Sequence, residues 1–296
     1  MITGPTRTPE RGILDDSFFY DALCRRDNLG KGQEPLSLPQ KIKLRELRDS
    51  VNGFIPHAHD QYGVDLLHHV PEPTWKHIPL DEWHGLPSHE RRIHREEARG
   101  HDLADRLFLP SLKEIPHGKA LDIGVGSGVP LAYLQKKDGL HSWHGVDLEG
   151  TTPEDMCGKS CDRRKLPNFR EYDPNGPLPY ADHEFEVVLL NNVLHNVPEK
   201  DQAAFIQDVR RIVKPGGKIL VLEEFTGTTH DDRKHARAVK CTDALFYPKY
   251  PSEQRPLAHW EKQFAGLDIE KQRYVGLVNI VGMPTVENFY QLRNRE

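Results

Sequence analysis

Residues 119–131 combine an acidic side chain with three glycines at alternate positions. A short apolar run ending in Asp122 predicts a buried strand, and the residues from 129 onward are typical of a helix with Pro130 in its first turn. The glycines between these two elements are Gly124, Gly126 and Gly128. A strand, a glycine loop and a helix N-terminus together can bind a nucleotide. The glycines let a ligand approach bare backbone, and the helix end offers unpaired N–H groups.

The spacing of the glycines disfavours a dinucleotide site. The dinucleotide fingerprint is G-x-G-x-x-G, whereas this loop reads G-x-G-x-G and has Val129 where the fingerprint needs its last glycine. The loop, led by an acidic residue, resembles the first motif of the class I S-adenosylmethionine (SAM) methyltransferases. That resemblance implies that Asp122 lies near the methionine amino group, directly or through water, and that the three glycines line the methionine and ribose. The alternative is a tight turn without a ligand.

The chain from residue 117 alternates strands and helices, which is the α/β pattern. A strand over 142–147 ends in Asp147, where nucleotide-binding folds place the acidic residue that hydrogen-bonds a ribose diol. Glu149 is a second candidate for that role, and a simple turn cap is the alternative. A third strand over 168–172 is followed by Asp173, which by the same resemblance meets the adenine amino group.

The fourth strand and its surroundings extend the resemblance. Residues 178–188 resemble the signature that precedes the fourth strand of this superfamily, and the apolar run 187–190 predicts a strand buried on both faces. Asn191 leaves that strand at its carboxyl end, where ligands bind in open α/β sheets, so we count it among the cofactor contacts. The further expected elements are a helix over 199–213 stopped by 214–217, a strand over 218–223, helices over 231–245 and 260–264, and an antiparallel hairpin of 268–275 with 285–292.

His195 is the candidate general base. It follows the fourth strand, beside the expected methyl position, and an imidazole suits proton removal near neutral pH. The small-molecule O-methyltransferases with an "HDW" motif carry their catalytic His at the matching position and a Glu flanking it, which corresponds to Glu223. This sequence has Asn196 and Val197 in place of the Asp and Trp. A His that only packs or caps is the alternative.

Residues 1–116 lie outside the resemblance, and we expect a mainly helical and irregular cap that covers the substrate. Its predicted helices cover 36–52, ending at Gly53, and 88–108. The proline- and histidine-rich stretch from Pro56 to Pro87 should break regular structure. The histidines around residues 57–59 and 68–69 could hold a metal, but no third ligand stands at a diagnostic spacing, so we expect none.

Composition limits the class of protein further. The 296 residues carry a net charge of −5 and no basic tract, which disfavours a nucleic-acid partner. No apolar run approaches the ~20 residues that span a bilayer, and nothing resembles a signal peptide. The four cysteines are expected to be free thiols. We expect a cytoplasmic protein of open oligomeric state, a homodimer being one option.

These observations predict a Rossmann-like seven-stranded, mostly parallel sheet with helices on both faces, formed by residues 117–296 behind the cap of 1–116. The expected function is SAM-dependent methyl transfer to a small molecule, with O-methylation favoured. The alternatives are N- or C-methylation of a natural-product intermediate, and a SAM-binding protein of this fold that transfers no methyl group.

Overall fold

The computed structural model of the chain describes residues 53–64, 97–149, 163–246, 254–278 and 284–295. Seven strands form one sheet in the order β3-β2-β1-β4-β5-β7-β6, in which the pairs from β3 to β5 are parallel and β7 runs antiparallel to both β5 and β6. The strands are β1 (Gly118–Ile123), β2 (His141–Leu148), β3 (Phe169–Tyr172), β4 (Phe185–Asn191), β5 (Val213–Glu224), β6 (Leu267–Val278) and β7 (Pro284–Asn294). The predicted fold, a mostly parallel seven-stranded sheet, is confirmed.

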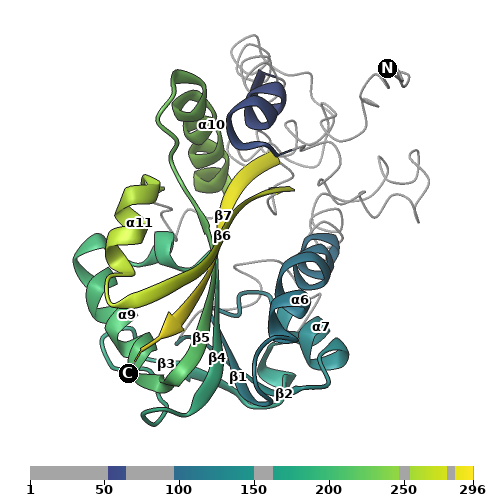
Figure 1. Cartoon of the computed structure of the whole chain (residues 1–296), viewed down its shortest axis with the longest axis vertical. Coiled ribbons are helices and arrows are strands. Elements are labelled where there is room, and N and C mark those ends of the chain that lie inside the picture. The colour runs from purple at the N-terminus through teal and green to yellow at the C-terminus, as the bar shows by residue number, and fades with distance from the viewer. Residues whose placement is uncertain (1–52, 65–96, 150–162, 247–253, 279–283, 296) are drawn as a thin grey trace, which may run out of the picture.

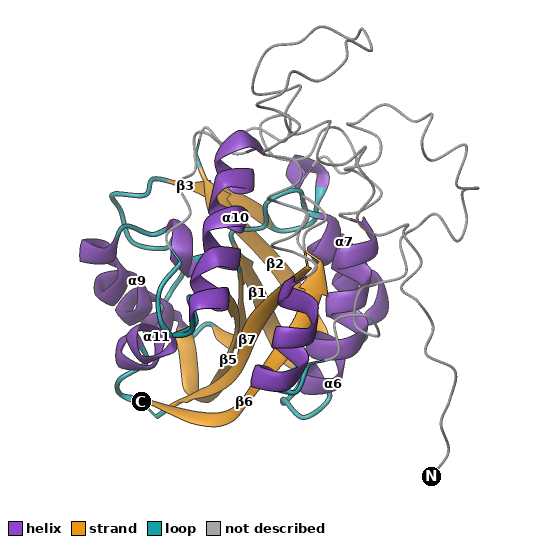
Figure 2. Cartoon of the chain, turned by 90° about the horizontal axis from the view of Figure 1, so that it is seen from above, coloured by secondary structure: helices purple, strands orange, loops and turns teal. Residues whose placement is uncertain are grey.

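Helices cover both faces of this sheet (Figure 1; Figure 2). On one face lie α7 (Val129–Lys137) and a continuous segment made of helical residues 97–103, a π-helical turn (Ala104–Phe108) and α6 (Leu109–Leu112). On the other face lie α9 (Glu199–Ile212) and α11 (Leu257–Gln263). Helix α10 (His230–Phe246) follows β5. No helix within these ranges is both long and apolar enough to cross a membrane.

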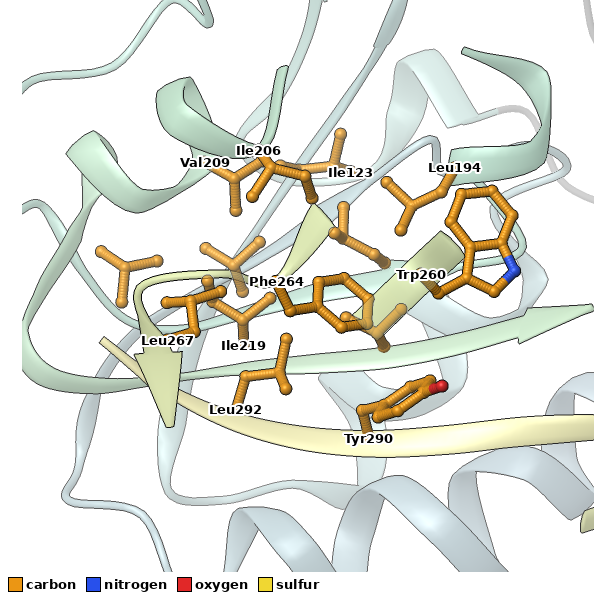
Figure 3. Close-up of a cluster of buried hydrophobic side chains, with 14 of the residues drawn as sticks. Ile123, Leu194, Ile206, Val209, Ile219, Trp260, Phe264, Leu267, Tyr290 and Leu292 are labelled. Carbon is orange, nitrogen blue, oxygen red and sulfur yellow. The ribbon is translucent and has the colours of Figure 1, made fainter. Parts of the chain in front are cut away.

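The cluster beneath α9 and α11 shows why these segments form where they do (Figure 3). The α9 residues Ile206, Val209 and Ile212 recur at helical spacing and are buried against the sheet. From α11, Trp260 is fully buried, and its Nε1 donates to the Glu224 carbonyl oxygen at 2.9 Å. The large indole therefore loses its apolar surface to the core without leaving its N–H unsatisfied.

Two local predictions differ from the structure. Strand β5 begins at Val213, not at Lys218, because Val213 already pairs with Phe185 before residues 214–217 loop out and Lys218 pairs with Val187. Residues 53–62 are helical, so the prediction of irregular structure at Pro56 is wrong there.

Other N-terminal predictions lie partly or wholly beyond these ranges. The expected helix over 36–52 is outside the described residues. The expected helix over 88–108 is described from residue 97 and runs on into α6.

The contact between β2 and α7 gives a test of packing. A Cβ on Gly145 would lie 2.6 Å from Leu131 Cδ2 and 2.9 Å from Val125 Cγ2, both buried. We predict that Gly145→Ala lowers the free energy of unfolding by about 1–3 kcal/mol through overpacking, as measured by urea denaturation. Gly139→Ala is the matched control, because nothing lies within 4 Å of its Cβ position, and it should change little. Equal effects at the two sites would contradict the prediction.

Candidate active site

The predicted site residues gather where parallel strands end. Asp122 lies in β1, Asp147 in β2, Asn191 ends β4, and Glu223 is the penultimate residue of β5. Parallel strands end at the same edge of a sheet, so these four side chains belong to one edge. The glycine loop and the turn that carries His195 leave from this edge as well.

The glycine loop has the backbone that its sequence predicts. The φ angles of its glycines are positive, at 72°, 58° and 82° for Gly124, Gly126 and Gly128. Gly128 is the N-cap residue of α7. A Cβ on Gly124 would lie 2.8 Å from Val193 Cγ2, in the turn after β4. Glycine is therefore needed at this position for its left-handed backbone and for close approach to the neighbouring turn.

Asp147 holds this loop in place. Its Oδ2 accepts hydrogen bonds from the Gly126 N–H at 2.9 Å and from Arg163 Nη1 at 2.7 Å, and its Oδ1 accepts from the Leu148 N–H at 2.8 Å. Burial raises the pKa of Asp147, although the Arg163 charge opposes that shift. Arg163 is fully buried, and no sequence signal distinguished it from the basic residues beside it. A ribose bound by Asp147, as predicted, would share this carboxylate with Arg163.

Asp122 is a buried carboxyl group without a hydrogen-bond partner or counter-charge among the described residues. It is only 3% exposed, and burial, followed by the nearby charge of Asp147, raises its pKa to about 8. Its side chain makes no hydrogen bond with any other described residue. An ammonium group would supply both the charge and the donors that this carboxylate lacks, so the residues present fit the amino group of SAM.

His195 and Glu223 form a buried pair. His195 Nδ1 lies in hydrogen-bonding contact with Glu223 Oε1, and the other carboxylate oxygen accepts from the Leu194 N–H at 2.8 Å. Glu223 thereby fixes both the turn Leu194–Asn196 and the imidazole that it carries. A carboxylate on Nδ1 selects the tautomer in which Nε2 is the proton acceptor. The two residues that the sequence singled out for chemistry are in contact.

A polar cluster beside this pair was not predicted. Asn192 has a positive φ of 57°, and its Nδ2 donates to Glu287 Oε2 at 3.0 Å. Glu287 is fully buried in β7 and also receives Thr285 Oγ1 (3.3 Å) and Arg99 Nη2 (3.4 Å). The pattern of β7 indicated only a strand, and Arg99 lay within a run of charged residues.

Asp173 takes a different place. It is exposed after β3, and its Oδ1 accepts from the Asn175 N–H at 2.9 Å and from Asn175 Nδ2 at 3.0 Å, within its own turn. No contact among the described residues joins it to the other predicted residues, and its adenine role stays a prediction.

The histidines near the N-terminus have other partners where they are described. His57 Nε2 lies 2.8 Å from Asp232 Oδ1, and His59 is exposed beside Asp60. Within the described ranges, no three His, Cys, Asp or Glu side chains are placed to hold a metal ion. The pair His68–His69 and the cysteines 157 and 161 lie outside those ranges.

The residues around this site match a known family of protein domains. Residues 121–221, from the end of β1 into β5, match the family model described as a methyltransferase domain. The match contains the glycine loop, Asp147 and His195, on a sheet of the order given above. This match supports the resemblance of the domain to the class I SAM-dependent methyltransferases, with SAM as the cofactor. The contacts of the glycine loop and of Asp122 with SAM stay predictions.

Two bacterial relatives each match less than half of this chain. The chain is 26% identical over 120 residues to a ubiquinone/menaquinone biosynthesis C-methyltransferase of Geotalea daltonii, covering 40% of this chain and 50% of that protein. The namesake from Shewanella sediminis is 43% identical over 135 residues, covering 44% and 52%. The matched region thus spans about half the length of these relatives. A solved SAM-dependent methyltransferase from Methanosarcina mazei aligns with a TM-score of 0.47 and 16% identity, over 62% of this chain and 97% of that one.

The buried Asp122 predicts a measurable pH dependence. Its folded pKa of about 8 lies above the ordinary value of 3.8, so the folded protein binds more protons between these values, and stability falls as the pH rises through that window. In ligand-free Asp122→Asn this loss is absent. Its stability relative to wild type should therefore grow by about 1.4 kcal/mol per pH unit, as measured by urea denaturation from pH 5 to pH 8.

The same variant should bind S-adenosylhomocysteine more weakly, because the ligand's ammonium loses its carboxylate. Asp60→Asn replaces a carboxylate that is 83% exposed and should change neither property. Parallel stability curves for Asp122→Asn and wild type would show that Asp122 is not a buried, protonated group.

Proposed function

We propose that this methyltransferase transfers the methyl group of SAM to a hydroxyl oxygen of a small-molecule acceptor, with His195 as general base. The observation that carries the proposal is the buried contact between His195 Nδ1 and Glu223 Oε1 at the edge where β4 and β5 end. Glu223 orients the ring and stabilises the imidazolium that forms when Nε2 takes the hydroxyl proton.

SAM, when bound, would supply an activated methyl group: a bond would form between the acceptor oxygen and the methyl carbon as the carbon–sulfur bond breaks and the neutral thioether leaves. The chain's own residues do the rest of the work. Asp122 would hold the amino group, and the glycine loop would line the methionine and ribose. Asp147 would hold the ribose diol, with Asn191 and Asp173 as further contacts. His195 would receive the proton that the acceptor loses, which typically contributes about 10²–10⁴-fold to the rate.

We also propose that residues 1–116 form the cap over the acceptor, with the methyltransferase domain in 117–296. Support comes from the helix of residues 53–62, which packs onto α10 and the end of β5. Together they line a recess of about 30 Å³, the size of a water molecule, whose walls include Phe54, Tyr62 and Phe225. Aromatic walls with a few polar groups are typical of sites for small organic molecules, and an acceptor would have to widen this recess to enter it.

One carboxylate fastens this helix to α10. Asp232 accepts from His57 Nε2 at 2.8 Å and from the Thr229 N–H at 2.9 Å, and the Tyr62 hydroxyl donates to it too. Burial acts to raise the pKa of Asp232, but these hydrogen bonds outweigh it and hold the pKa below its ordinary value. The ionised carboxylate therefore serves as a stable anchor for the cap at neutral pH.

C-methylation is the second candidate, because the two bacterial relatives are named C-methyltransferases. The same base could serve it, since removal of a phenolic proton activates the neighbouring ring carbon as well as the oxygen. The test is an untargeted screen for products after incubation with SAM carrying a deuterated methyl group. An O–CD₃ product supports the first candidate, and a C–CD₃ product supports the second. An N–CD₃ product, or none from any acceptor, would contradict both.

With an acceptor identified, we predict that His195→Ala reduces kcat by about 10²–10⁴-fold while the Kd for S-adenosylhomocysteine stays the same. Glu223→Gln should reduce kcat as well, because a neutral amide stabilises the imidazolium less. His230→Ala, at an exposed histidine, is the control and should leave kcat unchanged. Wild-type turnover in His195→Ala would assign His195 a structural role.

A further inference from the structure

A buried arginine lies beside the segment that leaves the glycine loop. Arg99 is 9% exposed within helical residues 97–103. The next residue, Gly100, packs on the first turn of α7: its Cβ position lies 3.2 Å from Val129 Cγ1 and 3.3 Å from Pro130 Cγ. The N-cap of that helix is Gly128, the last glycine of the loop. The residue after Arg99 therefore packs against the helix that follows the glycine loop.

The guanidinium of Arg99 is under-compensated for a buried cation. Its Nη2 reaches Glu287 Oε1 at 3.4 Å, which is a long hydrogen bond, and its Nε is buried with no partner among the described residues. Glu287 also receives Asn192 and Thr285, and burial raises its pKa, which favours its neutral form. An arginine cannot shed its proton, so its remaining donors call for an anion.

The cofactor carries one anion, and the contacts indicate where it lies. Asp122 is a buried acid in β1, directly before the glycine loop, and Arg99 is a buried base next to the Gly100 that packs on the helix after that loop. The turn after β4 contacts both regions, because Val193 packs against Gly124 while Asn192 bonds the Glu287 that Arg99 contacts. The amino-acid part of SAM holds an ammonium and a carboxylate on one carbon, which complements this pair.

We infer that Arg99 binds the carboxylate of the cofactor's methionine moiety, opposite the ammonium at Asp122. The inference rests on the assignment of SAM as cofactor and adds a contact from the N-terminal region, which the sequence did not connect with the site. It also gives the cap a direct link to the cofactor, through the helix that continues into α6.

The test compares two ligands that share adenosine and the thioether sulfur. S-adenosylhomocysteine has the amino-acid group, and 5′-methylthioadenosine lacks it. By calorimetry, Arg99→Gln should bind S-adenosylhomocysteine about 10- to 100-fold more weakly than wild type, the loss of a charge-assisted hydrogen bond, and 5′-methylthioadenosine equally well. Arg99→Lys keeps the charge and should recover part of the lost affinity. Arg106→Gln is the control, since Arg106 pairs with Asp102 on the same segment.

Several outcomes would overturn the inference. An equal loss for both ligands in Arg99→Gln would show that Arg99 supports the fold of the site, and thermal unfolding of the ligand-free variant would detect that loss independently. Unchanged affinity for S-adenosylhomocysteine would place the carboxylate elsewhere. If wild type bound neither ligand, the cofactor assignment would fail and the inference with it, which distinguishes that failure from the failure of Arg99 alone.

Discussion

The site depends on the hydrogen bond from the Gly126 N–H to the Asp147 carboxylate, which ties the loop after β1 to the end of β2. A loop of three left-handed glycines exposes peptide groups that need acceptors, and the parallel register of β1 and β2 brings the carboxylate to them. Arg163, buried against the same carboxylate, pairs with it at 2.7 Å and opposes the rise that burial causes in its pKa. A tethered glycine loop is a preformed surface, so little ordering remains to be done when a ligand binds.

Charge is concentrated at this edge of the sheet at a cost to stability. Asp122, Glu223 and Glu287 are all nearly or fully buried there, and for two of them burial itself raises the pKa. Buried hydrophobic packing elsewhere in the fold offsets that cost. One example is the cluster in which Trp260 and Phe264 pack against the sheet (Figure 3). Partly compensated buried charges above a well-packed core are typical of a functional site.

The sequence could predict the elements that have regular periods and strong turn signals. The run 187–190 indicated a buried central strand because it is apolar throughout. The three glycines predicted a tight turn after β1. The contact of His195 with Glu223 was implied by the resemblance to the O-methyltransferases with an "HDW" motif, and the adjacent parallel strands β4 and β5 bring the two residues together. Propensity misled at Pro56, because residues 53–62 are helical in spite of the proline.

The sequence could not predict the long-range polar contacts, for a different reason. Nothing local distinguishes Arg163 from Arg164, or Glu287 from any other acidic residue in a strand. Which of two neighbouring arginines is buried depends on tertiary packing, and cross-strand partners are set by the order of strands in the sheet. The place of Glu287 beside the site follows only once β7 is known to pair with β5.

The place of β7 has a consequence for how the chain folds during synthesis. It is the last strand in sequence, yet it lies between β5 and β6, and its reversed direction brings Thr285 and Glu287 to the edge where the other strands end. Glu287 is synthesised 188 residues after Arg99, so their contact can form only late. The glycine loop and Asp147 are close in sequence and can come into contact much earlier. Until then the edge of β5 stays open to pairing with other chains. Insertion of the final strand closes that edge and completes the polar cluster in a single late step.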